Sequence, residues 1–138
     1  MESASIKQIR VVAGLIIRDD YLLACQRDEK GAFPLKWEFP GGKVENDESD
    51  FAALRRELKE ELDITVHDAH EVFQHKHSYP NGPTVSLHFF EVSRHDGEMV
   101  NRVFQRIMWV KLAELEGLDF LEGDRPVITK LINHGAFS

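Results

Sequence analysis

The chain has 138 residues, 42% of them hydrophobic and 30% charged, which predicts a single domain, residues 1–138, with enough apolar material for a core. Its formal net charge is −7 and it has no basic run, so we expect no nucleic-acid partner. The chain has one cysteine, Cys25, which suits a reducing compartment. No stretch approaches the roughly 18 apolar residues that a membrane span needs. We therefore expect a cytoplasmic protein with no membrane partner.

The apolar pattern along the chain predicts several short strands. Ile9–Ile17 is β-branched and almost continuously apolar, which is typical of a strand buried on both faces. Asp19 and Asp20 predict a turn, so the strands on either side of them are expected to form a hairpin. In chain order, the expected strands are Ile9–Ile17, Tyr21–Gln26, a short piece in Trp37–Pro40 that is broken at Gly41-Gly42, Ala69–His77, Thr84–Ser93 and Phe104–Val110.

Two segments have the spacing of amphipathic helices. Ser49 can cap a helix over Asp50–Leu62, along which apolar residues recur three or four positions apart. Asp124 is expected to cap a last helix that has Pro126 in its first turn, and Leu112–Glu116 is expected to form one helical turn. This order of elements predicts an α+β fold, an α/β/α sandwich in which a mixed β-sheet is flanked by helices.

Three glutamates gather near the C-terminal end of the first predicted helix. Glu57, Glu60 and Glu61 lie at i, i+3 and i+4, where like charges repel by roughly 0.2–0.5 kcal/mol per pair. The helix dipole also disfavours anions at this end. A bound cation would relieve both effects, and carboxylates suit Mg²⁺, with Mn²⁺ as a substitute. The alternative is a solvated acidic face paired with the basic residues of the helix, which are Arg55, Arg56 and Lys59.

The segment around this helix resembles the Nudix box. Gly42 is followed after five residues by Glu48, and after seven more by the run Arg56–Ile64, which reads Arg-Glu-Leu-Lys-Glu-Glu-Leu-Asp-Ile. Only the last glycine of the pattern differs, and Asp63, which stands there, tolerates a left-handed conformation better than most residues. A looser likeness to MutT-type members extends over Ile9–Leu131. We expect Glu48 to tie the loop to the helix.

The resemblance implies the Nudix fold and a hydrolase whose box helix binds Mg²⁺. Glu60 and Glu61 match the direct metal ligands, and the Gly41 carbonyl matches a further one. Glu57 matches a residue that helps to bind metal or to activate water, and Arg56 matches the residue that orients the glutamates. The implied metal ligands are therefore Gly41, Glu57, Glu60 and Glu61, and the implied catalytic residues are Arg56, Glu57 and Glu60.

The resemblance also implies a set of substrate-binding residues. Arg27 matches a phosphate-contacting position, although it could be a plain exposed arginine at a strand end, and Lys43 is a second candidate. Asp124 falls where MutT-type enzymes place a base-reading side chain, and it could also be a plain helix cap. The aromatic residues that could stack on a base, or simply pack in the core or a loop, are Phe33, Phe39 and Phe120.

The implied reaction is water attack on a nucleoside triphosphate, giving a nucleoside monophosphate and pyrophosphate. Many relatives carry an acid that helps with water or metal where this chain has Val103, so Glu57 is the expected general base. The expected substrate is an oxidised purine such as 8-oxo-dGTP, or a pyrimidine such as CTP. The alternatives are an ADP-ribose or dinucleotide pyrophosphatase and a non-catalytic nucleotide-sensing module. Two cellular roles stay open, which are sanitation of the nucleotide pool in support of DNA repair and nucleotide catabolism. The protein could be a monomer or a homodimer.

Overall fold

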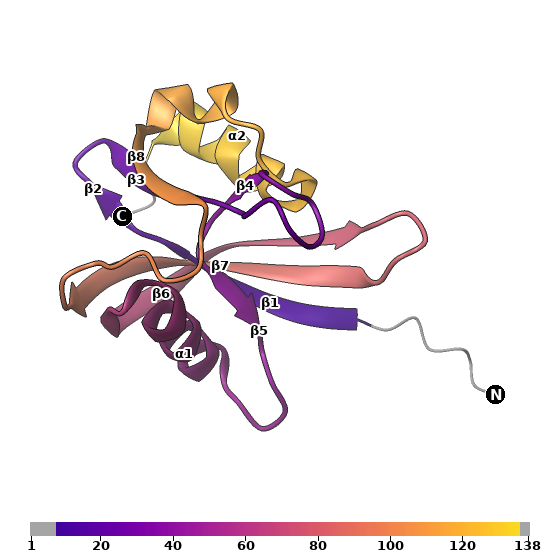
Figure 1. Cartoon of the computed structure of the whole chain (residues 1–138), viewed down its shortest axis with the longest axis horizontal. Helices are drawn as coiled ribbons and strands as arrows, with labels where there is room; N and C mark the ends of the chain where they lie inside the picture. Colours follow the sequence, from indigo (N-terminus) through magenta and orange to yellow (C-terminus); the bar gives the residue numbers. More distant parts are fainter. Residues whose placement is uncertain (1–7, 136–138) are drawn as a thin grey trace.

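The computed structural model describes residues 8–135, which form strands and helices in the order shown in Figure 1. The strands are β1 Gln8–Leu15, β2 Ile17–Arg18, β3 Tyr21–Gln26, β4 Trp37–Glu38, β5 Gly41–Lys43, β6 Thr65–Ser78, β7 Thr84–Asp96 and β8 Arg106–Lys111. The helices are α1 Asp50–Leu62 and α2 Arg125–His134, with the 3-10 turns η1 Leu112–Gly117 and η2 Glu122–Asp124. Within residues 8–135, no helix has both the length and the apolar character needed to cross a membrane.

The strands form two sheets of four strands each. The first has the order β5-β1-β7-β6, and only its β1–β7 pair is parallel. In the second, β3 pairs with β8 along its length and with β2 and β4 near its two ends. The prediction of a single sheet and of one strand over Ile9–Ile17 was therefore wrong. The chain leaves strand geometry at Ile16, so this apolar run supplies β1 to one sheet and β2 to the other. An apolar pattern alone does not distinguish the two cases, because the sequence stays apolar across the break at Ile16.

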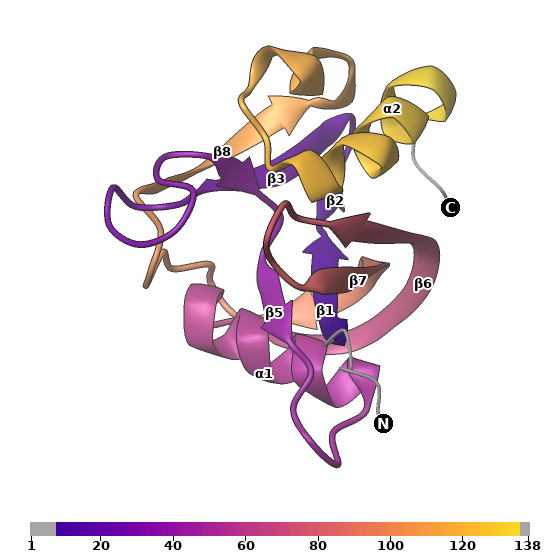
Figure 2. The ribbon, with the colours of Figure 1, turned by 90° about the vertical axis from the view of Figure 1, so that its right-hand side faces the viewer.

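The helices cover opposite sides of the strands, as Figures 1 and 2 show, so the predicted α/β/α class is confirmed. Successive residues of the central strands point to opposite sides, as the pleat requires. Leu87 and Phe89 of β7 belong to the core beneath α2, whereas Phe90 and Val92 belong to the core beneath α1. Burial on both sides is the physical reason why the central strands lack the alternation of a half-exposed strand.

Helix α1 begins and ends where the sequence predicts. The Ser49 side chain accepts a hydrogen bond from the Ala52 backbone N–H at 3.1 Å, which caps the first turn. Asp63 ends the helix in the left-handed region, with φ 59° and ψ 32°, and its N–H donates to the Lys59 carbonyl. Aspartate therefore takes over the place of the glycine that the Nudix box has here.

Two predictions near β5 and the start of α2 were wrong. Gly41 and Gly42 do not break the chain; they belong to β5, which pairs with Val12 and Ala13 of β1. A Cβ atom at Gly41 would collide with the Val12 carbonyl, so glycine allows this close approach of the two backbones. Asp124 does not cap α2, because η2 has already wound its backbone into the helical region and no side-chain cap bond is present.

Candidate active site

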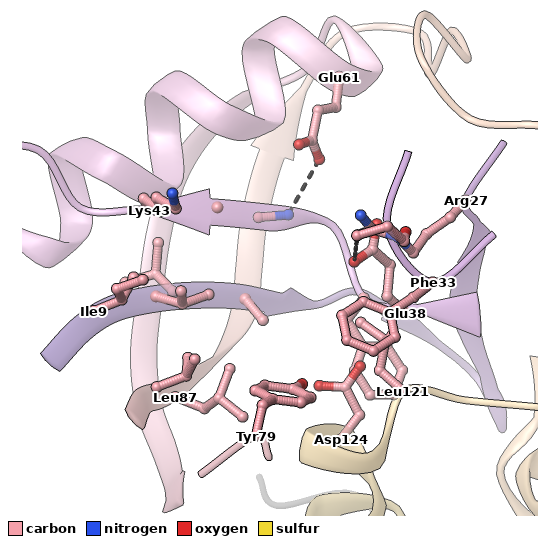
Figure 3. A pocket seen from close by; sticks show the side chains of 18 residues that line it. Ile9, Arg27, Phe33, Glu38, Lys43, Glu61, Tyr79, Leu87, Leu121 and Asp124 are labelled. Carbon is pink, nitrogen blue, oxygen red and sulfur yellow. Dashed lines mark hydrogen bonds and ion pairs between the residues drawn. The ribbon is translucent and has the colours of Figure 1, made fainter. Parts of the chain in front are cut away.

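A cavity of about 370 Å³ opens where β1, β5 and β7 meet the loop after β3 and the turn before α2. Figure 3 shows Glu61 on the side of α1 and Asp124 with Tyr79 on the opposite side. The sequence-predicted residues that line the cavity are Arg27, Phe33, Phe39, Gly41, Lys43, Glu61 and Asp124. The other predicted residues, Arg56, Glu57 and Glu60, lie on α1 outside its lining.

Glu57 and Glu61 bring two carboxyl groups together beside β5. The Glu57 carboxylate lies over Gly42, where a Cβ atom would collide with it. One oxygen of Glu61 accepts a hydrogen bond from the Gly41 N–H at 3.1 Å. Burial raises the pKa of Glu61 to about 9, helped by the hydrogen bond and the charge of Glu57. Glu61 therefore holds a proton at neutral pH in the absence of a cation.

This pair fits a divalent cation. Two neighbouring carboxylates repel unless a proton or a cation lies between them, and carboxylate oxygens are the ligands that Mg²⁺ prefers. The Gly41 backbone lies at the same place, since its N–H reaches Glu61. Glu60 is the more exposed member of the set, with 59% of its side chain accessible, and one of its oxygens lies 3.6 Å from Arg56 Nη1. Solvent can therefore reach this face of α1 from the side of Glu60.

Arg56 connects the loop, the helix and β5. Its Nε and Nη2 donate to the two oxygens of Glu48 at 2.8 and 3.0 Å, which is a bidentate pair. Nη1 donates to Glu57 at 2.9 Å, and Nη2 also donates to the Lys43 carbonyl at 3.0 Å. The hydrogen bond from Arg56 lowers the pKa of Glu48 to about 2. Glu48 thus ties the loop to the helix as expected, and Arg56 holds Glu57 in place over β5.

Arg27 and Glu38 form a partly buried ion pair at the wall of the cavity. Arg27 Nη1 donates to a Glu38 oxygen at 3.0 Å, and Arg27 Nε donates to the Ala32 carbonyl at 3.0 Å. Burial raises the pKa of Glu38, and the neighbouring Arg27 opposes that rise. Sequence reasoning did not single out Glu38, because its partner Arg27 lies eleven residues away and the pairing of β3 with β4 brings them together.

Asp124 is the one acid at the opposite end of the cavity. It is buried, with 6% of its surface accessible, and burial raises its pKa well above the usual range, with the charge of Glu38 as a further cause. Because its side chain does not cap α2, the carboxyl group is free to face the cavity, as Figure 3 shows. A neutral carboxylic acid both donates and accepts hydrogen bonds, so this group can pair with a polar edge of a ligand.

Aromatic residues surround Asp124. Phe33 and Tyr79 line the cavity with ring centroids 5.3 Å apart, and Phe33 is 45% accessible at the mouth. Phe39 also lines the cavity, but it is 4% accessible and packs against Phe89 and Phe120. Phe33 and Tyr79 are therefore better placed than Phe39 to meet a planar ligand. The sequence did not predict that Tyr79 lines the cavity, because Tyr79 lies in a segment with only a loose likeness to relatives.

A separate acidic and histidine cluster lies at the other end of α1. Asp50, Glu71 and His88 offer ligand atoms within 4.8 Å of one another. Arg10 donates to both Asp50 oxygens, at 2.7 and 2.6 Å, and His88 Nδ1 lies 2.6 Å from a Glu71 oxygen. Protein partners thus occupy these oxygens, so we assign the cluster to holding the start of α1 against the sheet.

Comparisons with known proteins agree with this geometry. The family model described as the NUDIX domain matches residues 7–131. The chain is similar to a CTP pyrophosphohydrolase of Escherichia coli (strain K12), with 35% identity over 122 residues that cover 88% of this chain and 90% of the relative. It is similar to an 8-oxo-dGTP diphosphatase of Haemophilus influenzae, with 35% identity over 129 residues that cover 92% of this chain and 93% of the relative.

A solved structure agrees as well. The solution structure of the Escherichia coli ORF135 protein matches with a TM-score of 0.84 and 33% identity, covering 96% of this chain and 94% of that one. The family model and the relatives both span most of the chain, and the box acids lie together beside β5. The resemblance found in the sequence is thus confirmed, and the chain belongs to the Nudix family of hydrolases.

Proposed function

We propose that this protein is a MutT-type nucleoside triphosphate pyrophosphohydrolase that releases a nucleoside monophosphate and pyrophosphate. The observation that carries the proposal is the two-ended cavity. One end holds Glu61 and the β5 backbone, and the other holds Asp124 between aromatic rings. Metal-bound phosphates suit the first end and a planar base suits the second. The names of the two similar relatives, which refer to 8-oxo-dGTP and CTP, support a nucleotide of this class.

Mg²⁺ is the proposed cofactor, with Mn²⁺ as a substitute, and the residues that would hold it are Gly41 through its carbonyl, Glu57, Glu60 and Glu61. When bound, the cation neutralises the phosphate charge and lowers the pKa of a water ligand. Support comes from the raised pKa of Glu61 beside Glu57, because a bound cation would replace the proton on Glu61. Arg56 fixes the position of Glu57 through a 2.9 Å hydrogen bond, so its proposed part is to orient this glutamate.

The reaction that we propose is hydrolysis of the α–β phosphoanhydride. A water oxygen forms a bond to one of the two phosphorus atoms, the bond from that atom to the bridging oxygen breaks, and the bridging oxygen leaves with the other phosphate. The water proton passes to Glu57. Glu57 is the proposed base because Val103, 51% accessible, offers no carboxylate at the position where many relatives have one. Arg27, held by Glu38, would contact the phosphates, and Lys43 lines the same cavity as a second cation.

Asp124, Phe33 and Tyr79 are the proposed base-binding residues. The raised pKa of Asp124 favours its neutral form, which can donate to a carbonyl oxygen and accept from a neighbouring N–H. 8-Oxo-dGTP has such an edge. CTP has an amino group that can donate to the Asp124 carboxyl group and a ring nitrogen that can accept from it. Both nucleotides are therefore proposed substrates. Stacking on Phe33 at the mouth would add binding that depends little on the base.

The cellular setting is part of the same proposal. We propose that residues 1–138 act as one Nudix domain in the cytoplasm, as a monomer or a homodimer, with a nucleotide as the only partner. Cys25 is buried and has a raised pKa because of its burial, which suits a reduced, inert thiol. Removal of oxidised nucleotides would make the protein part of DNA repair, whereas CTP turnover would make it part of nucleotide catabolism.

The test is pyrophosphate release from 8-oxo-dGTP, the eight common ribo- and deoxyribonucleoside triphosphates and ADP-ribose, each with Mg²⁺. We expect release from one triphosphate, and a loss of about 100-fold or more in Glu60→Gln, which corresponds to about 2.7 kcal/mol of barrier. Glu114→Gln is the matched control, because Glu114 is an exposed acid on η1, away from the box.

Two results would contradict the proposal. Faster turnover of ADP-ribose than of any triphosphate would make the protein a pyrophosphatase of another substrate class. No turnover of any nucleotide by a folded protein that binds Mg²⁺ would favour a nucleotide sensor. The presence of all three box glutamates on α1 argues for the enzyme.

A further inference from the structure

The Tyr79 ring, at the end of the cavity that holds Asp124, packs against a side chain that lies outside the cavity. Phe33, which also lines the cavity, lies 5.3 Å from Tyr79, measured between ring centroids. The ring of His77 lies closer to Tyr79, at 4.4 Å and with an interplanar angle of 78°. An edge-to-face pair of this kind is a favourable arrangement of two aromatic rings. Because His77 is not part of the cavity lining, any effect of His77 on a ligand passes through a neighbour such as Tyr79.

His77 belongs to the regular part of β6, whereas Tyr79 does not. The pairing of β6 with β7 continues as far as Ser78, and His77 lies opposite Val85 in a stretch without a register shift. Tyr79 lies one residue beyond the strand, and its N–H donates to the Pro83 carbonyl at 3.4 Å. The strand therefore fixes the ring of His77, and the ring of Tyr79 packs on it from the turn.

The turn that carries Asp124 packs on the same two side chains. Gly123 is buried in η2, where a Cβ atom would lie 3.4 Å from Tyr79 Oη and 3.7 Å from His77 Cβ. The same atom would lie only 2.7 Å from Leu87 Cδ1, so glycine lets η2 approach β6 and β7 more closely than a residue with a side chain would. Asp124 follows directly, and Figure 3 shows its carboxyl group facing the Tyr79 hydroxyl. A movement of the Tyr79 ring would therefore change the space beside Asp124.

We propose that His77 is a positioning residue for base recognition, because it holds the Tyr79 ring in the place where this ring and Asp124 together bound one end of the cavity. The inference rests on the proposed function and deepens it, because it assigns part of the affinity for the base to a residue that the base does not touch. Without the His77 ring, the Tyr79 ring is free to turn, and part of the binding energy is then used to order it. The reacting phosphates lie toward Glu61, so the chemical step is unaffected.

The test compares variants that keep or remove the ring at position 77. His77→Ala is expected to raise the KM of the preferred triphosphate about fivefold, as for one lost aromatic pair, with kcat nearly unchanged. His77→Phe, which keeps an aromatic ring, is expected to restore KM. His75→Ala is the matched control, because His75 lies two residues earlier on β6, with its ring centroid 6.0 Å from that of His77. Calorimetric binding of CMP and dGMP, which needs no turnover, should rank the variants in the same order.

A double variant shows whether the effect passes through Tyr79. In a protein that already carries Tyr79→Ala, the addition of His77→Ala should change KM by no more than about twofold, because the ring that His77 holds is gone. Additive losses, a loss of the same size in His75→Ala, or no recovery in His77→Phe would overturn the inference. Triphosphate hydrolysis with a KM that His77→Ala leaves unchanged would refute the role of His77 and leave the proposed function intact. A wild type that neither hydrolyses nor binds a nucleotide would refute both.

Discussion

The carboxylate of Glu57 lies directly over Gly42, so closely that a Cβ atom on this glycine would overlap it. The position of a proposed catalytic group is thus set by the absence of a side chain on the neighbouring strand. Arg56 holds the same carboxylate from the other side at 2.9 Å. Glu57 therefore has little freedom to move. A general base needs such a fixed position, because it must take a proton from a water molecule in one particular geometry.

Gly42→Ala is therefore expected to displace Glu57 and to lower kcat on the order of 10- to 100-fold. The fold should persist, because Glu57 is a side chain that can shift. Gly117→Ala is the matched control, since a Cβ atom there meets nothing within 4 Å. Steady-state kinetics give the activity and thermal melting confirms folding. Full activity in Gly42→Ala would mean that the position of Glu57 is unimportant.

Arg56→Lys tests the bidentate pair with Glu48. Lysine keeps the charge but cannot donate to both oxygens at once, so we expect the free energy of unfolding to fall by about 1–2 kcal/mol. Urea denaturation measures the loss, and a cycle with Glu48→Gln isolates the coupling between the two residues. Arg55→Lys, one position earlier on the exposed face of α1, should change little. Additive effects of Arg56→Lys and Glu48→Gln would show that the pair does not contribute.

Mg²⁺ binding should release a proton. Without a cation the pKa of Glu61 is about 9, so at pH 7 the Glu57–Glu61 pair holds a proton that a metal ligand must lose. The apparent affinity for Mg²⁺ should accordingly rise with pH up to about 9. Calorimetry at pH 7 in buffers with different ionisation enthalpies counts the protons released. We expect Glu61→Gln to abolish the release and Glu114→Gln to keep it; metal binding by the wild type without proton release would contradict this account.

The stability of the protein should fall with rising pH because of Asp124. Its folded-state pKa lies well above the unfolded value, so its neutral form favours folding at low pH. That contribution is lost as the pH rises through the folded-state pKa, at about 1.4 kcal/mol per pH unit. Asp124→Asn should therefore remove this slope from urea denaturation as the pH rises above the unfolded-state value of 3.8. Asp20→Asn, at an exposed position, serves as the control, and parallel slopes in wild type and Asp124→Asn would refute the assignment.

Phe33 should contribute to binding without affecting the chemical step. Phe33→Ala is expected to raise KM about tenfold with kcat nearly unchanged, because stacking of a base on an aromatic ring is lost. Leu35→Ala is a matched control: both residues have a positive φ, 53° and 62°, in the same exposed loop, but only Phe33 lines the cavity. Phe33→Tyr should behave as the wild type. Equal effects at both positions would indicate a change of the loop instead of a lost contact.

Much of the site could be predicted from the sequence because its parts are local. Glu57, Glu60 and Glu61 lie on one helix, so their spacing alone places them on one side of it. The helix limits followed from Ser49 and Asp63, whose effects act within one turn of the backbone. The three glutamates also lie in the segment that resembles the Nudix box, and the family model that matches the chain spans this segment.

The tertiary structure decided the relationships between distant segments. The pairing of β3 with β4 brings Arg27 to Glu38, and the turn before α2 brings Asp124 to the cavity that Tyr79 also lines, 45 residues earlier in the chain. The sequence could not reveal that η2 leads directly into α2, so that the Asp124 side chain makes no capping hydrogen bond. Such relationships depend on strand pairing and burial, which act through space, whereas helix spacing and caps act along the chain. For that reason the sequence identified the acidic helix, and only the fold defined the cavity beside it.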